Sequence, residues 1–136
     1  MTQATGSWLI IGCGYLGEQV LAQLRMTGAH LAVVTRDAAR ATAFGAAGIQ
    51  CFVGSFADTP RLQALCARLP APLRVLVLLP PSACQDAAGT LAPLARLVAL
   101  VRVIAPATAT LSSSTGVYGE QGSRTVSAES ACLPVS

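Results

Sequence analysis

The sequence predicts an α/β protein built on a doubly wound parallel sheet of about five strands in the order 3-2-1-4-5. Two observations lead to this prediction. Short apolar runs alternate with helical patterns along the chain, and these runs are apolar at consecutive positions. Strands that are apolar on both faces and separated by helices form a parallel sheet with helices on both sides. Right-handed crossovers then give the doubly wound arrangement.

The first strand, the first helix and the second strand follow one another near the N-terminus. Trp8–Ile11 is an apolar run typical of a buried strand. Tyr15–Met26 has a helical pattern that ends before Gly28, and Leu31–Val34 is the second apolar run. The apolar positions that we expect to face the sheet are Leu16, Val20 and Leu24.

Two shorter helices and the third strand come next. Asp37 can cap a helix over Asp37–Phe44, and Ile49–Val53 is typical of a third strand. Thr59 followed by Pro60 predicts the N-cap and the first-turn proline of another helix, which ends at "LPAP". The predicted buried face of this helix consists of Leu62, Leu65, Cys66 and Leu69.

The remaining strands and helix complete the predicted sheet. Arg74–Leu79 is nearly all Val and Leu and predicts the fourth strand, and a helix is expected over Thr90–Val101. After Pro106, "ATATLSS" predicts a fifth strand that is less apolar than the others and lies at the edge of the sheet. Because an exposed edge favours pairing with another chain, we expect a homodimer through this edge or poor solubility. The predicted buried stripe of the helix consists of Leu91, Leu94, Val98 and Val101.

A glycine motif separates the first strand from the first helix. Gly12, Gly14 and Gly17 form the pattern GxGxxG. The first glycine permits a tight turn, the second lets the backbone approach a pyrophosphate, and the third lets the helix pack closely on the strand. The helix N-terminus offers amide groups and a partial positive charge to phosphates. The motif lies in a strand–turn–helix–strand unit, which predicts a dinucleotide site. The alternative is that the glycines serve only the packing of the turn.

The residues at the end of the second strand favour NADP(H) over NAD(H). An NAD site usually places an acid there, about twenty residues after the glycines. Here Thr35 stands in its place and Arg36 follows. A guanidinium suits the 2′-phosphate of NADP. Asp37 is a rival acid that would suit NAD, although it also makes a good helix cap, and an ordinary exposed arginine is the alternative for Arg36.

A second segment strengthens the prediction through a family resemblance. "LSSSTGVYGEQG", Leu111–Gly122, resembles the segment after the fifth strand of extended short-chain dehydrogenases/reductases, where a Ser/Thr-rich strand end runs into a V-Y-G turn. With the "GCGYLG" opening, the whole chain is similar to the cofactor-binding N-terminal part of this family of NAD(P)-dependent epimerases and dehydratases, particularly its less typical members. The resemblance implies a Rossmann fold over residues 1–136, without the catalytic helix and the substrate-binding part.

The resemblance also implies roles in cofactor binding. Ser55 and Phe56 are expected beside the adenine ring, although the family often has an acid where Ser55 stands. Leu79 and Pro80 are expected under the ribose on the nicotinamide side. The residues expected to contact the cofactor are Gly12, Gly14, Tyr15, Leu16, Gly17, Thr35, Arg36, Ser55, Phe56, Leu79 and Pro80.

Two further residues correspond to the substrate side of the family's site. Ser114 matches the hydroxyl residue that binds the substrate carbonyl or alcohol, with a local strand-end hydrogen bond as the alternative role. Tyr118 belongs to the V-Y-G turn, and we expect it to pack that turn, because the family's catalytic tyrosine comes later in the chain.

The family's acid/base pair, a tyrosine and a lysine four residues apart, is missing. The sequence contains no lysine, and its tyrosines are Tyr15 and Tyr118, the latter followed four residues on by Gly122. A tyrosine with a pKa of about 10 is a poor base at neutral pH without such help. We expect that the chain stops before the catalytic helix, since the predicted sheet is unfinished. The alternative is a member of the family that lacks the pair.

Composition excludes several other classes of protein. The hydrophobic fraction of 53% and the charged fraction of 11% argue against a disordered chain. Nine scattered arginines give a net charge of +3 without a basic block, so we expect no nucleic-acid partner. No signal peptide or membrane span is evident, which predicts a cytoplasmic protein without membrane contact. Five separated cysteines and one histidine predict buried reduced thiols and no metal site.

We therefore expect an NADP(H)-binding domain of an oxidoreductase or epimerase, with NAD(H) as the alternative cofactor. In the complete enzyme, hydride would pass between the nicotinamide and a small-molecule carbonyl or alcohol substrate. The chain alone is expected to bind the cofactor without turnover. One alternative is a non-catalytic sensor or regulatory module that reads the NADP(H) state. Another is a domain that binds nothing and keeps its glycines for packing.

Overall fold

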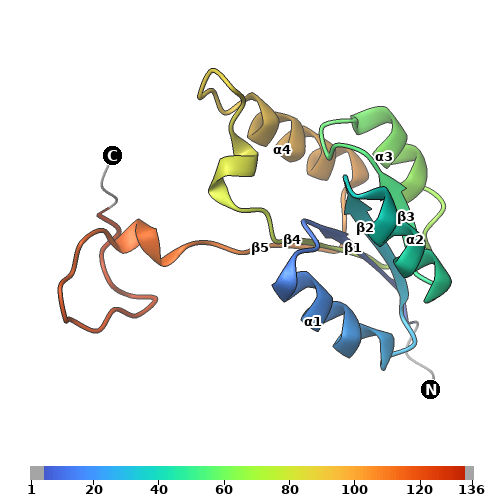
Figure 1. Cartoon of the computed structure of the whole chain (residues 1–136), viewed down its shortest axis with the longest axis horizontal. Coiled ribbons are helices and arrows are strands. Elements are labelled where there is room, and N and C mark those ends of the chain that lie inside the picture. Colours follow the sequence, from blue (N-terminus) through green and yellow to red (C-terminus); the bar gives the residue numbers. More distant parts are fainter. Residues whose placement is uncertain (1–4, 134–136) are drawn as a thin grey trace.

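Five parallel strands form one sheet in the order β3-β2-β1-β4-β5, which confirms the predicted order. The structure is a computed structural model that describes residues 5–133 (Figure 1). Its elements in chain order are β1 (Ser7–Ile11), α1 (Tyr15–Arg25), β2 (His30–Thr35), α2 (Ala38–Ala46), β3 (Gln50–Val53), α3 (Thr59–Cys66), β4 (Leu73–Val77), the 3₁₀ turn η1 (Pro81–Cys84), α4 (Ala92–Ile104), β5 (Thr108–Leu111) and the 3₁₀ turn η2 (Thr115–Tyr118).

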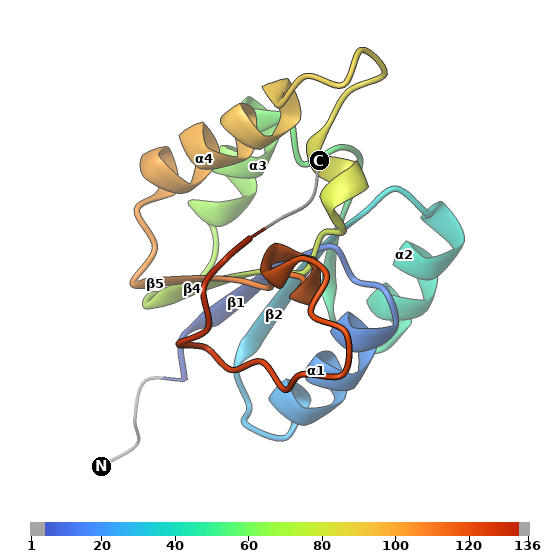
Figure 2. The ribbon, with the colours of Figure 1, turned by 90° about the vertical axis from the view of Figure 1, so that its left-hand side faces the viewer.

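Helices cover both faces of the sheet and create two apolar cores. Figure 2 shows α3 and α4 on one side of the strands and α1 and α2 on the other. The central strand β1 serves both cores, because successive side chains of a strand point to opposite faces. Leu9 and Ile11 belong to the core under α3 and α4, whereas Ile10 belongs to the core under α1 and α2, and all three are fully buried. This explains why the strand is apolar at consecutive positions.

The buried face of α1 differs from the predicted one. Gly17 and Leu21 are its buried residues, and Leu24 packs partly buried against the same core. Leu16, predicted to face the sheet, is 55% exposed. The glycine explains the difference, because a Cβ on Gly17 would lie 3.0 Å from Cys13 Sγ and 3.3 Å from the Gly12 carbonyl oxygen. This close contact fixes the rotation of the helix, so that positions 17, 21 and 24 share the inner face.

The buried face of α4 is also shifted from the prediction. Leu97 and Leu100 are buried, whereas Leu91 and Val98 are 55% and 45% exposed. The helix carries apolar residues on all sides, "APLARLVALVRVI", so spacing alone does not determine which side is buried. Contact with α3 and the sheet determines it instead.

Several element boundaries also differ from the prediction, among them the start of α3 and the end of β4. Asp58, rather than Thr59, is the N-cap of α3, and its carboxylate accepts a hydrogen bond from the Arg61 amide at 3.4 Å. The fourth strand ends at Val77 instead of Leu79. The chain therefore leaves the sheet two residues earlier than expected, so that Leu78 and Leu79 lie beside the glycine turn instead of inside the strand.

β5 is the edge strand on the β4 side, and its four residues are all exposed. Within residues 5–133 it pairs with β4 alone, with Ala109 beside Val75 and Leu111 beside Val77. After β5 the chain leaves the sheet, as Figure 1 shows, and turns back so that Gly119 contacts the Leu133 carbonyl. In residues 5–133, no helix has both the length and the apolar character that a membrane span requires.

Candidate functional site

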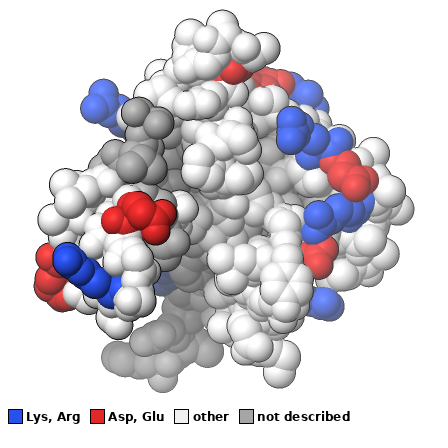
Figure 3. Space-filling view, turned by 60° about the vertical axis from the view of Figure 1, so that its left-hand side comes forward, with Lys and Arg blue, Asp and Glu red and all other residues white. Residues whose placement is uncertain are grey.

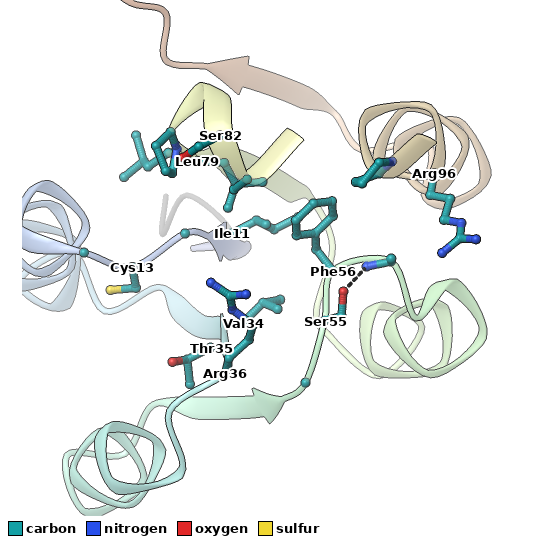
Figure 4. A pocket seen from close by; sticks show the side chains of 18 of the residues that line it. Ile11, Cys13, Val34, Thr35, Arg36, Ser55, Phe56, Leu79, Ser82 and Arg96 are labelled. Atoms are coloured by element: carbon teal, nitrogen blue, oxygen red, sulfur yellow. Dashed lines mark hydrogen bonds between the residues drawn. The ribbon is translucent and has the colours of Figure 1, made fainter. Parts of the chain in front are cut away.

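A cavity of about 630 Å³ opens at the carboxyl ends of the strands (Figure 4). Its walls come from the turns that follow β1, β2, β3 and β4 and from the first turns of α4. Ligands of open α/β sheets bind at this edge, where neighbouring crossovers diverge to opposite faces. The lining residues are Ile11, Gly12, Cys13, Gly14, Val34, Thr35, Arg36, Arg40, Gly54, Ser55, Phe56, Ala57, Leu78, Leu79, Pro80, Ser82, Ala83, Gln85, Pro93 and Arg96.

Gly12 allows the turn after β1 to press against the chain that follows β4. Its φ is +91°, a conformation that residues with a Cβ rarely adopt. A Cβ on Gly12 would lie 2.9 Å from both the carbonyl carbon and the carbonyl oxygen of Leu78. The Leu78 amide also donates a hydrogen bond to the Ile11 carbonyl at 2.8 Å. Gly12 is therefore required by the fold itself.

Gly14 has a different environment. Its φ of −87° suits any residue, and a Cβ built there meets no described atom within 4 Å. It lines the cavity and is the N-cap of α1, where it supplies no capping side chain. The amides of the first helical turn are thus not capped by it, and such amides bind anions. Packing among the described residues therefore does not require a glycine at position 14.

Arg36 and Asp37 point in different directions at the end of β2. Figure 4 shows the Arg36 side chain extending into the cavity. The Asp37 carboxylate instead caps α2, accepting hydrogen bonds from the Ala39 amide at 2.9 Å and the Arg40 amide at 3.1 Å. Asp37 is not among the residues that line the cavity. The cation, rather than the rival acid, therefore lines the cavity.

The residues after β3 and β4 form apolar and small polar walls. Ser55 lines the cavity, and its hydroxyl accepts a hydrogen bond from the Ala57 amide at 3.1 Å. Phe56 lines it too and packs partly buried against the core under α3 and α4. Leu79 and Pro80 line the side next to β4. These walls are mostly apolar, as is common in pockets for small molecules.

Four of the predicted site residues lie outside the cavity lining. Tyr15 is 82% exposed, Leu16 is exposed as well, and neither is among the residues that line the cavity. Gly17 is buried against Cys13, where it serves the packing of α1. Ser114 follows β5 and is exposed, and its carbonyl accepts a hydrogen bond from the Val117 amide at 3.2 Å.

The structure adds polar residues that the sequence did not reveal. Arg40 lies on α2 and Arg96 near the start of α4, and Ser82 and Gln85 come from η1 and its end. No local motif marks these positions, because they depend on how each helix is rotated and placed. The four-residue spacing from Arg36 to Arg40 is no such signal either, because Arg36 precedes the N-cap Asp37 and does not lie on α2.

The cavity carries positive charge. Among the described residues that line it, three are arginines and none is an aspartate or a glutamate. Arg40 forms an ion pair with Glu18 of α1, while no ion pair of Arg36 or Arg96 is found in residues 5–133. Over the whole face shown in Figure 3, basic and acidic side chains are interspersed. The described lining of the cavity thus combines positive charge with no carboxylate, which favours an anionic ligand over a cationic one.

Burial raises the pKa of the Cys13 thiol to about 11, and the nearby Arg40 guanidinium opposes part of this rise. The thiol is therefore neutral near pH 7 and is a poor nucleophile. Burial also raises the thiol pKa values of Cys51 and Cys66. In residues 5–133, no three His, Cys, Asp or Glu side chains gather in a way that could hold a metal ion.

Solved structures match this fold, although no protein-family model and no curated protein matches the sequence. The UDP-glucose 4-epimerase of Stenotrophomonas maltophila, solved with NAD and formylated UDP-arabinopyranose, matches with a TM-score of 0.75 and 20% identity over 94% of this chain and 43% of that chain. WbmG of Bordetella bronchiseptica, in complex with NAD and UDP, matches with a TM-score of 0.71 and 19% identity over 94% of this chain and 44% of that chain. ChuY, an anaerobillin reductase of Escherichia coli O157:H7, matches with a TM-score of 0.65 and 20% identity over 81% of this chain and 52% of that chain.

These likenesses show the fold of the chain, a Rossmann-type α/β sheet. They confirm the expected resemblance to epimerase-type proteins at the level of the fold. The chain spans about half the length of the solved structures that it matches.

Proposed function

We propose that this chain binds a nicotinamide dinucleotide, with NADP(H) preferred over NAD(H), as the cofactor domain of an oxidoreductase or epimerase of the extended short-chain type. The observation that carries the proposal is the cavity at the carboxyl edge, which combines the open Gly14 turn with three arginines and no lining carboxylate. The two UDP-linked neighbours were solved with NAD, which supports a dinucleotide of this class.

The residues of the cavity fit such a ligand in three places. The space next to Gly14 and the start of α1 accepts the pyrophosphate, because no Cβ intervenes. Arg36 faces the 2′-phosphate, since Asp37 is engaged in capping α2. Ser55 and Phe56 border the adenine, and Leu79 and Pro80 border the other ribose. When bound, the nicotinamide would supply hydride transfer to a carbonyl or alcohol substrate, with Ser114 as the expected substrate contact in the whole protein.

A non-catalytic NADP(H) sensor is the second candidate, and one observation favours it. The described residues that line the cavity include no Tyr, Lys, His, Asp or Glu. The cavity therefore offers binding groups without a side chain that is a ready proton donor or acceptor near pH 7. Nucleotide binding without any oxidation of NADPH in the presence of carbonyl compounds would favour the sensor, whereas turnover would favour the enzyme.

The experiment that tests the proposal is a calorimetric titration of the purified chain with NADPH and, in parallel, with NADH. We expect saturable binding of both nucleotides, tighter for NADPH. Arg36→Ala should weaken NADPH binding about tenfold or more and leave NADH binding nearly unchanged, because one charge-assisted pair to the phosphate is lost. Arg68→Ala is the matched control, since Arg68 is exposed and lies outside the cavity. A folded chain that binds neither nucleotide would refute the proposal.

A further inference from the structure

Arg40 is a second cation of the cavity that Arg36 lines, and it contacts another helix. It lies in the first turn of α2 and lines the cavity. Its guanidinium forms an ion pair with Glu18 in the first turn of α1, and it lies over the Phe44 ring at 5.8 Å from the ring centre. The side chain is thus held between two helices, with one edge toward the cavity.

Glu18 forms its ion pair with Arg40 from outside the cavity lining. Glu18 is not among the residues that line the cavity, whereas Arg40 is. The pair is partly exposed to solvent, with 36% of the Arg40 side chain and 48% of the Glu18 side chain accessible. An ion pair of this kind contributes little to stability, and a guanidinium has five N–H donors, so it can keep Glu18 and bind another anion simultaneously.

We propose that Arg40 is the second arginine of the 2′-phosphate subsite and that Glu18 is the positioning residue that presents it, so that the pair sets the selectivity for NADP(H) over NAD(H). This inference rests on the proposed dinucleotide function. A phosphate monoester carries a charge of about −1.5 to −2 at pH 7, which one guanidinium neutralises only in part. Arg36 and Arg40 would together offer the phosphate two guanidinium groups. Glu18 offsets part of the Arg40 charge, and none of the described residues that line the cavity is an aspartate or a glutamate.

The test measures dissociation constants for NADPH and NADH in five variants of the full chain. Arg40→Ala should weaken NADPH binding about tenfold and NADH binding less than about twofold, because the lost partner contacts only the phosphate. Glu18→Ala should also lower the selectivity for NADPH over NADH, by a smaller factor than Arg40→Ala does. The double variant should be no less selective than Arg40→Ala alone, since Glu18 acts through Arg40. Arg25→Ala is the control, because it removes the same charge from the exposed far end of α1.

The outcomes separate this inference from the proposed function. If the unaltered chain binds neither nucleotide, both fall. If it binds both but Arg40→Ala weakens NADPH and NADH equally, or changes neither, the inference falls and the proposed function stands. If Glu18→Ala still lowers the selectivity in the Arg40→Ala background, Glu18 does not act through Arg40 and its positioning role is refuted. Arg40→Lys should recover part of the selectivity, because the positive charge returns without the fork geometry.

Discussion

Gly12 and the backbone of Leu78 lie so close together that a single added Cβ would come within 2.9 Å of the Leu78 carbonyl group. We expect Gly12→Ala to lower the free energy of unfolding by about 2–4 kcal/mol, because the positive φ and the backbone contact both oppose a side chain. Gly48→Ala separates these causes, since Gly48 has a φ of +77° but no described atom within 4 Å of a built Cβ. If urea unfolding showed the same loss of free energy for Gly12→Ala and Gly48→Ala, the Leu78 contact would not contribute.

Gly14→Ala should have the opposite profile. The φ of Gly14 suits alanine and its Cβ would point into open space, so the unfolding free energy should change by less than about 1 kcal/mol. Nucleotide affinity should fall at least about tenfold, because the methyl group occupies the place of the pyrophosphate. Calorimetry with NADPH and NADH measures this loss, which should be similar for both. Unchanged affinity would show that no phosphate approaches this glycine.

The two sides of α4 give a third prediction. Leu100 is fully buried, so Leu100→Ala should lower the unfolding free energy by about 2–5 kcal/mol through lost contacts and a residual cavity. Val98 is 45% exposed on the same helix, and Val98→Ala should cost less than about 1 kcal/mol. Chemical denaturation of both variants measures the difference. A larger loss of unfolding free energy in Val98→Ala than in Leu100→Ala would contradict the observed buried face of α4 and favour the one predicted from the sequence.

The buried Cys13 thiol makes stability depend on alkaline pH. Its pKa rises from 9.0 to about 11 on folding, so the folded chain keeps its proton where the unfolded chain loses it. The contribution is fully present below pH 9 and is lost as pH rises through 11, a change of about 2–3 kcal/mol. Urea unfolding across this window should show a shallower decline in Cys13→Ala than in Cys132→Ala, where the exposed thiol serves as control. Identical slopes would argue against the burial of this thiol.

The exposed edge strand β5 leads to a prediction about association. We propose that two copies of the chain pair through this edge, because all four of its residues are exposed and none is charged. Sedimentation velocity should show association that increases with concentration. Thr110→Lys should reduce it, whereas Gln63→Lys on the exposed side of α3 should not. A chain that stays monomeric at all concentrations would refute the pairing.

The architecture could be predicted because each strand is short, apolar and separated by a helical pattern. The strand order then follows from right-handed crossovers, and the turn residues Gly12, Gly14 and Arg36 follow from their positions at strand ends. Sequence position alone places these residues in the site, because in a parallel sheet the turns that follow the strands all lie at the carboxyl edge.

Helix rotation and helix placement could not be predicted from spacing. α4 is apolar on every side, and the rotation of α1 depends on the contact between Gly17 and Cys13. Arg40 and Arg96 reach the cavity only because two helices meet the sheet at particular positions. Such contacts join residues that are distant in sequence, and a periodic pattern contains no information about them.

The open environment of Gly14 has a consequence for how sequences descended from this chain should diverge. Folding constrains Gly12, whereas only a bound ligand would constrain Gly14. A descendant that no longer needs a nucleotide can therefore replace Gly14 early and without loss of stability, while it retains Gly12. The residue at position 14 would then record whether a lineage still uses the cavity, and a lineage with a larger side chain there would have kept the scaffold after abandoning the ligand.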